Sequence, residues 1–126
     1  MVNDIVADTL IRIKNGYLAG KKEVLVPKTR MVLAICNLLV KSGYLQMASV
    51  KENNLVLELK YEQHVPALTD LEQISKPSLR VYVGKDKIPT VLGGMGVSVI
   101  STPQGLMTDK EAKKKGIGGE LICKVW

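Results

Sequence analysis

The sequence has no phenylalanine, one histidine and two cysteines among its 126 residues. Cys36 and Cys123 lie far apart and form neither a disulfide framework nor a C-x-x-C motif, so we expect both in the core of a protein kept in a reducing compartment. His64 has no cysteine or aspartate at a catalytic or metal-ligand spacing, and no G-x-S-x-G motif is present. A hydrolase that uses either thiol with His64 is therefore rejected, and we expect no catalytic residue, metal, cofactor or small-molecule substrate.

Long hydrophobic runs are also missing. The longest, Met31–Val40, is interrupted by Asn37 and is about half as long as the roughly twenty residues that a membrane span needs. Asp4 and Asp8 stand where a secretory signal carries positive charge. We therefore expect no membrane contact and no signal peptide.

Acidic residues are outnumbered by basic ones, 12 against 18, which gives a net charge of +6. The excess is uneven: residues 1–50 and 73–126 are basic, and residues 51–72 are acidic. Two basic lobes around an acidic middle favour binding to a phosphate-rich, salt-sensitive partner such as a nucleic acid. The alternative, a solvated basic surface without a partner, remains open at this point.

Hydrophobic periodicity predicts an α+β protein made of two small α/β lobes. The N-terminal lobe, residues 1–61, has the predicted order α-β-α-β-β, and Gly16 or Gly20 is expected to end its first helix. Residues 62–72 contain Pro66 and no firm period, which is typical of a linker. The segments expected in the first lobe are a helix from Asp4, a strand at Glu23–Val26, a helix over 32–39 that stops at Ser42-Gly43, and a hairpin of 44–50 with 55–61.

The C-terminal lobe, residues 73–126, is predicted to be mostly β with one short helix. Thr108 and Glu111 form a capping box that begins this helix, and Gly116 ends it. In the last strand Leu121 and Cys123 are expected to face opposite to Ile122 and Lys124. The predicted strands are 74–75, 79–83, 97–101 and 118–126.

A polar segment over 100–108 is interpreted as a turn that joins a strand directly to a helix N-terminus, where free amides attract anionic oxygen. Its candidate contacts are Ser101, Thr102, Gln104 and Gly105, and Lys110 and Lys113 follow on the helix. Hydroxyls that only cap the helix and lysines that are only solvated are the alternative. The few aromatic residues argue against base stacking on an exposed sheet and favour a folded RNA read through its wide minor groove.

Four ordered motifs resemble the bacterial-type ribosomal protein S8 (uS8) family over nearly the whole chain. They are the helix of residues 4–15 ending in R-I-K-N, the I-S-K-P-x-x-R-V-Y segment at 74–82, the I-P-x-V-x-x-G-M-G-V loop at 88–97, and the ending over 100–126 with S-T-x-x-G, T-D-x-E-A, G-x-G-G-E and V-W. Pro103 departs from the S-T-S-x-G pattern of the family, which removes one hydroxyl and one backbone donor.

The resemblance implies a structural, non-enzymatic protein of the small ribosomal subunit, in the cytoplasm or in an organelle. It further implies a primary binder of the central domain of small-subunit ribosomal RNA that lies beside neighbouring ribosomal proteins. A translational repressor that binds a messenger RNA fold mimicking the ribosomal site is the alternative. The RNA-binding residues that we expect are Ser101, Thr102, Gln104, Gly105, Lys76, Tyr82, Glu120, Lys110, Lys113, Lys28 and Arg30.

Overall fold

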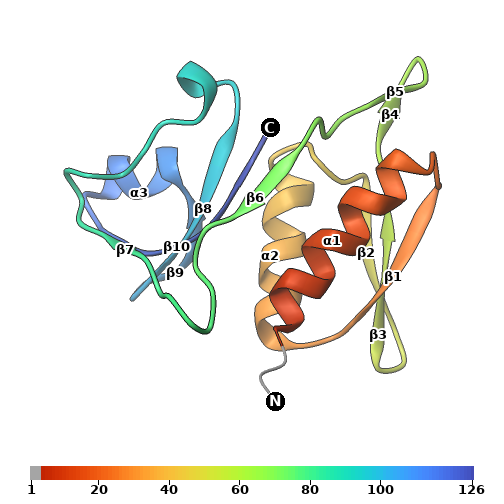
Figure 1. Ribbon diagram of the computed structural model, residues 1–126, viewed down its shortest axis with the longest axis horizontal. Coiled ribbons are helices and arrows are strands. Elements are labelled where there is room, and N and C mark those ends of the chain that lie inside the picture. Colours follow the sequence, from red (N-terminus) through yellow and green to blue (C-terminus); the bar gives the residue numbers. More distant parts are fainter. Residues whose placement is uncertain (1–3) are drawn as a thin grey trace. The chain divides into compact units, whose positions relative to one another are not determined.

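The computed structural model describes residues 4–126 and divides into two compact units, one ending at Thr69 and the other formed by Asp70–Trp126 (Figure 1). Within the described residues there are three α-helices and several antiparallel sheets, so the predicted α+β class is confirmed. None of the helices in this part of the chain is long and apolar enough to cross a membrane.

The first unit is a three-stranded antiparallel sheet with two helices packed against it (Figure 1). The strand order is β1-β3-β2, and Leu55 and Leu57 of the central strand are fully buried. The predicted order α-β-α-β-β is confirmed. The elements are α1 (Ile5–Leu18), β1 (Glu23–Pro27), α2 (Arg30–Lys41), β2 (Met47–Lys51) and β3 (Asn54–Glu58).

Side-chain caps fix where both helices begin. Asp4 accepts a hydrogen bond from the Ala7 amide at 3.0 Å, and Thr29 accepts one from the Val32 amide at 3.1 Å. Of the two glycines expected to end the first helix, Gly20 does so: α1 runs through Gly16 to Leu18, and Gly20 follows the C-cap Ala19 with a φ of 66°. A Cβ on Gly16 would overlap the Val24 side chain, so this glycine serves the close approach of α1 to β1.

Residues 62–72 are more ordered than the linker expected from the sequence. Strands β4 (Tyr61–Glu62) and β5 (Val65–Pro66) form a small hairpin that carries His64 at its exposed tip, with φ of 68°. Strand β6 (Leu71–Gln73) already belongs to the second unit, where it pairs with the last strand. The expected linker therefore contains parts of three short strands that the hydrophobic pattern did not reveal.

The second unit is a five-stranded antiparallel sheet with one short helix. The path β6-β10-β8-β9 makes up most of it, and β7 pairs with β10 beside β6. Of the two strands predicted at 74–75 and 79–83, only the end of the second forms one, β7. The remaining elements are β7 (Tyr82–Val83), the 3-10 turn η1 (Leu92–Gly94), β8 (Val97–Thr102), β9 (Gly105–Thr108), α3 (Asp109–Lys115) and β10 (Gly119–Val125).

The polar segment over 100–108 is a β-hairpin, not a strand-to-helix turn. Strands β8 and β9 pair from Val99–Thr108 to Thr102–Gly105, so Pro103 and Gln104 form a two-residue turn. Helix α3 begins only after β9, roughly 13 Å of strand away from that turn. Thr108 caps the helix as expected, since its hydroxyl accepts a hydrogen bond from the Glu111 amide at 3.3 Å. The Glu111 carboxylate accepts from the same hydroxyl at 3.4 Å, where a full capping box has it accept from the Thr108 amide. Gly116 ends the helix with φ of 67°.

Helix α3 covers one face of this sheet. Its Ala112 packs into a buried cluster with side chains from β8, β9 and β10, namely Ile100, Met107 and Leu121. The expected alternation along the last strand is wrong: the register shifts between Leu121 and Cys123, and Ile122 is the extra residue of a β-bulge. All three of these β10 residues are consequently buried.

Candidate nucleic-acid interface

Three side chains from three strands stand in one row at one end of the second sheet, on the face opposite to α3. Tyr82 of β7 is paired with Glu120 of β10, and Glu120 is paired with Ser101 of β8. Directly paired residues share a face, and the neighbouring Ile100 and Leu121 point into the cluster under α3. The pairing therefore gathers three of the expected RNA-binding residues on the opposite face.

Two glycines allow the strands to meet at this row. A Cβ on Gly119 would overlap the Ser101 carbonyl group, and a Cβ on Gly118 would overlap the Val83 carbonyl group. Any side chain at either position would push β10 away from its neighbours. Close strand packing therefore explains the two glycines of the G-x-G-G-E segment without any role in binding.

Neighbouring polar groups hold the Glu120 carboxylate in place. The Ser75 hydroxyl donates to Glu120 Oε2 at 2.5 Å and accepts from the Val81 amide at 3.1 Å. The Arg80 guanidinium reaches the same oxygen at 3.3 Å. The carboxylate is thus fixed through one oxygen, and its side chain is only 17% exposed.

The sequence analysis assigned no role to Ser75 or Arg80. The strand alternation of Arg80-Val81-Tyr82 was a signal that could have placed Arg80 on the face of Tyr82. The buried contact of Ser75 depends on pairing between distant parts of the chain, so no local signal could have revealed it.

Three other polar atoms of the row are available to bind a ligand. Within residues 4–126, the Ser101 hydroxyl, the Tyr82 hydroxyl and Glu120 Oε1 make no hydrogen bond. Tyr82 is 70% exposed, and Lys76 is exposed next to Ser75. The row thus offers two hydroxyls, one acceptor-only oxygen, an aromatic ring and a nearby cation to a ligand.

Thr102 differs from Ser101, although the two are adjacent. Its hydroxyl donates to the Gly105 carbonyl at 2.8 Å and accepts from the Gln104 amide at 3.1 Å, and the residue is buried. Pro103 takes the second position of the turn, where its fixed φ is favourable, and Gly105 supplies a φ of 111°. Thr102 therefore shapes the hairpin, which leaves Gln104 and Gly105 exposed at its tip.

The expected helix lysines do not join the row. Lys110 and Lys113 belong to α3, which lies on the other face of the sheet. Their ammonium groups donate to the Gly94 carbonyl at 2.9 Å and to the Thr90 hydroxyl at 2.7 Å. The structure thus separates these two lysines from Ser101, Tyr82 and Glu120.

Lys28 and Arg30 belong to the first unit, where both are exposed on either side of Thr29, the N-cap of α2. The first turn of α2 has no acidic residue. Free amides, the positive end of the helix dipole and two cations together favour an anion at this point.

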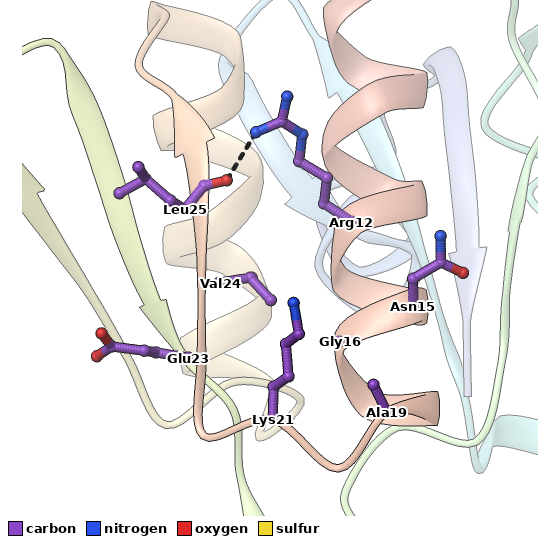
Figure 2. A pocket seen from close by; sticks show the side chains of 8 residues that line it. All are labelled: Arg12, Asn15, Gly16, Ala19, Lys21, Glu23, Val24 and Leu25. Atoms are coloured by element: carbon purple, nitrogen blue, oxygen red, sulfur yellow. Dashed lines mark hydrogen bonds between the residues drawn. The ribbon is translucent and has the colours of Figure 1, made fainter.

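A shallow hollow of about 530 Å³ lies between α1 and β1 in the first unit (Figure 2). At one end Arg12 donates to the Leu25 carbonyl at 2.9 Å and pairs with Asp8 at 3.1 Å. Lys21 points into the hollow from the other end (Figure 2). Arg12 thus covers a carbonyl of an edge strand, which limits pairing with other strands.

The cysteines are unsuited to nucleophilic chemistry. Cys36 and Cys123 are buried and free, and burial raises the pKa of each thiol to about 12. The expectation that both are core residues is confirmed. Among residues 4–126, no group of three histidine, cysteine, aspartate or glutamate side chains is placed to hold a metal ion.

Comparison with known proteins gives one consistent family. The sequence profile of "Ribosomal protein S8" matches residues 4–126. The small ribosomal subunit protein uS8c of Oltmannsiellopsis viridis is 46% identical over 129 aligned positions and 100% of both chains. The uS8 protein of Thermosynechococcus vestitus is 44% identical over 99% of this chain and 98% of its own, and that of Hydrogenovibrio crunogenus is 42% identical over 98% of both.

The relatives are bacterial and chloroplast ribosomal proteins, which places the chain on a ribosome in the cytoplasm or in an organelle. Their family is one of structural proteins and not of enzymes. The match covers every described residue of both units, including the row of Tyr82, Glu120 and Ser101. The chain therefore belongs to the ribosomal protein S8 family of the small subunit.

Proposed function

We propose that this protein is a primary binder of small-subunit ribosomal RNA, that it docks on the central domain, and that the row of Tyr82, Glu120 and Ser101 makes the specific contact. One observation carries the proposal: Tyr82, Glu120 and Ser101 stand side by side with hydrogen-bonding atoms that the protein itself does not use. Uncommitted polar groups held on paired strands are suited to reading a fixed RNA shape.

Glu120 indicates which part of the RNA lies against the row. A carboxylate repels phosphate and accepts hydrogen bonds only, so its ligands are ribose 2′-hydroxyls or amino groups on base edges. Both are displayed in the wide minor groove and in bulged loops of folded RNA. Tyr82 adds a ring face for an unstacked base or a ribose, and Lys76 adds a cation for the adjacent phosphate.

The other expected residues contribute at the margins of this contact. Gln104 and Gly105 extend it at the exposed hairpin tip, and Thr102 holds the tip in shape. Lys110 and Lys113 add long-range attraction, because they lie on the opposite face. Lys28 and Arg30 give the first unit a phosphate contact of its own.

A titration against a central-domain RNA fragment tests the proposal. We expect tight, salt-sensitive binding to the folded fragment and much weaker binding to the same fragment with its base pairs disrupted. Binding that ignores either the RNA fold or the salt concentration would refute specific docking. Competition by a messenger fragment of the same shape would support the repressor alternative, because one surface that reads one shape cannot distinguish the transcripts.

A matched pair of charge variants separates specific contact from general attraction. Glu120→Gln and the exposed Glu72→Gln on β6 raise the net charge by the same amount. Simple attraction to RNA would strengthen binding in both. If Glu120 accepts a hydrogen bond from the RNA, Glu120→Gln instead weakens binding by roughly 1.5–3 kcal/mol, while Glu72→Gln does not.

A further inference from the structure

Two large apolar side chains stand exposed at the end of the loop between β7 and β8. Leu92 is 59% exposed and Met95 is 85% exposed, whereas Ile88 and Val91 of the same loop are buried. The segment runs through the 3-10 turn η1 before β8 begins. We call the side chains of Leu92 and Met95 the apolar knob.

The backbone beneath the knob is held in an unusual conformation. Leu92, Gly93 and Gly94 have φ angles of 46°, 63° and 96°, and a leucine adopts positive φ only at a conformational cost. The Gly94 and Gly96 amides both donate to the Val91 carbonyl, at 2.9 and 3.1 Å. Such strain persists only where surrounding contacts enforce it, and it is concentrated at functional positions.

Two side chains of helix α3 help to hold this loop in its conformation. Lys110 bonds the Gly94 carbonyl, and Lys113 bonds the Thr90 hydroxyl, on either side of Leu92. Both ammonium groups are exposed beside the knob. The loop is thus preorganised, with an apolar tip and two lysine side chains of α3 bound beside it.

We infer that the apolar knob inserts into an apolar socket with an acidic rim on a neighbouring protein of the small subunit. The aliphatic side chains of Leu92 and Met95 gain free energy only when they leave water for an apolar surface, and folded RNA exposes little of that. Because the lysines beside the knob are positively charged, a partner surface with acidic residues around the socket is electrostatically complementary to it. The inference rests on the proposed function only in placing the chain in an assembled small subunit.

Site-directed crosslinking identifies what the knob touches. In Met95→Cys, the new thiol is exposed while Cys36 and Cys123 are buried, so a benzophenone maleimide attaches at position 95 alone. The labelled protein is assembled with small-subunit ribosomal RNA and the purified small-subunit proteins, and then irradiated. We expect an adduct to one protein, at an apolar segment flanked by acidic residues. An adduct to RNA, or no adduct, would overturn the inference.

A matched pair of variants checks that the knob contributes binding energy. Leu92→Asn removes the side chain but tolerates positive φ, so its thermal stability should equal or exceed that of the wild type. Leu18→Asn changes another exposed leucine, on α1. We expect Leu92→Asn to weaken retention of the crosslinked partner by about tenfold or more, and Leu18→Asn to leave it unchanged.

Equal retention of that partner in the two variants would overturn the inference. Their affinity for the central-domain RNA fragment is measured in parallel and should match that of the wild type. Failure of the proposed RNA face is detected separately, as unchanged RNA affinity in Glu120→Gln.

Discussion

Ser101 and Thr102 carry similar hydroxyls at adjacent positions, yet the structure predicts opposite effects of removing them. The variants Ser101→Ala and Thr102→Val each delete one hydroxyl. The Ser101 hydroxyl makes no hydrogen bond within the described chain, whereas the Thr102 hydroxyl makes two. We expect Ser101→Ala to weaken RNA binding and Thr102→Val to weaken the fold.

The magnitudes follow from the hydrogen bonds. Thr102→Val leaves the Gln104 amide and the Gly105 carbonyl without their partner, at about 0.5–1.5 kcal/mol each, so the free energy of unfolding should fall by about 1–3 kcal/mol. Ser101→Ala should change it by less than about 0.5 kcal/mol. If RNA groups left unpaired in the complex cost about 1–3 kcal/mol, Ser101→Ala weakens binding roughly 5- to 150-fold.

Two measurements on each variant decide the matter. Urea unfolding followed by circular dichroism gives the free energy of unfolding, and titration of the central-domain RNA fragment at fixed salt gives the affinity. The reasoning fails if Ser101→Ala binds RNA like the wild type. It also fails if Thr102→Val is as stable as the wild type.

Three further predictions concern stability. Gly119→Ala should lower the free energy of unfolding by about 1–3 kcal/mol, because its methyl group meets the Ser101 carbonyl group, whereas Gly84→Ala, with open space around it, should be nearly neutral in the same urea experiment. Thr108→Ala should cost about 1 kcal/mol in thermal unfolding, since it removes the cap of α3, and a loss near zero would contradict the capping role. The Cys123 thiol, with its pKa raised from 9.0 to about 12 by burial, stabilises the fold fully below pH 9, and that contribution is lost as the pH rises from 9 towards 12. The stability difference between wild type and Cys123→Ala, measured under reducing conditions, should therefore shrink by about 2 kcal/mol between pH 8.5 and 10.5; a constant difference would show that the thiol does not titrate in this way.

Local signals in the sequence predicted the helices well. The cap and stop residues of α3, Thr108 and Gly116, act as expected, and the apolar spacing in α1 and α2 marks buried faces. These features depend on neighbours within four residues, which a single sequence displays. The first unit, in which most elements are regular, was accordingly predicted in the correct order.

Strand pairing was the part that the sequence concealed. The short strand β9 was missed, so the polar turn was placed beside a helix start that lies at the other end of that strand. Two other features were missed for the same reason: the bulge at Ile122, and the pairing with β10 of β6, which begins inside the expected linker. Register depends on residues far apart in the chain, and short strands lack the length to show a period.

Strand pairing also decides which of the expected binding residues lie together. Ser101 was predicted from the polar segment, and Tyr82 and Glu120 from the family motifs, but only the pairing of three strands shows that they are neighbours. Lys110 and Lys113 are close to Ser101 in sequence and lie on the opposite face of the sheet. Proximity along the chain was thus a poor guide to proximity on the surface.

Strand β10 pairs with β6, β7 and β8, and it follows all three in the chain. During synthesis the first unit can close once residue 69 has emerged, whereas the second has no central strand until residues 119–125 appear. At roughly 5–20 residues per second, the second unit trails the first by about 3–11 s. A nascent chain therefore cannot capture RNA through Ser101 and Glu120 before β10 has emerged and taken its place between β7 and β8.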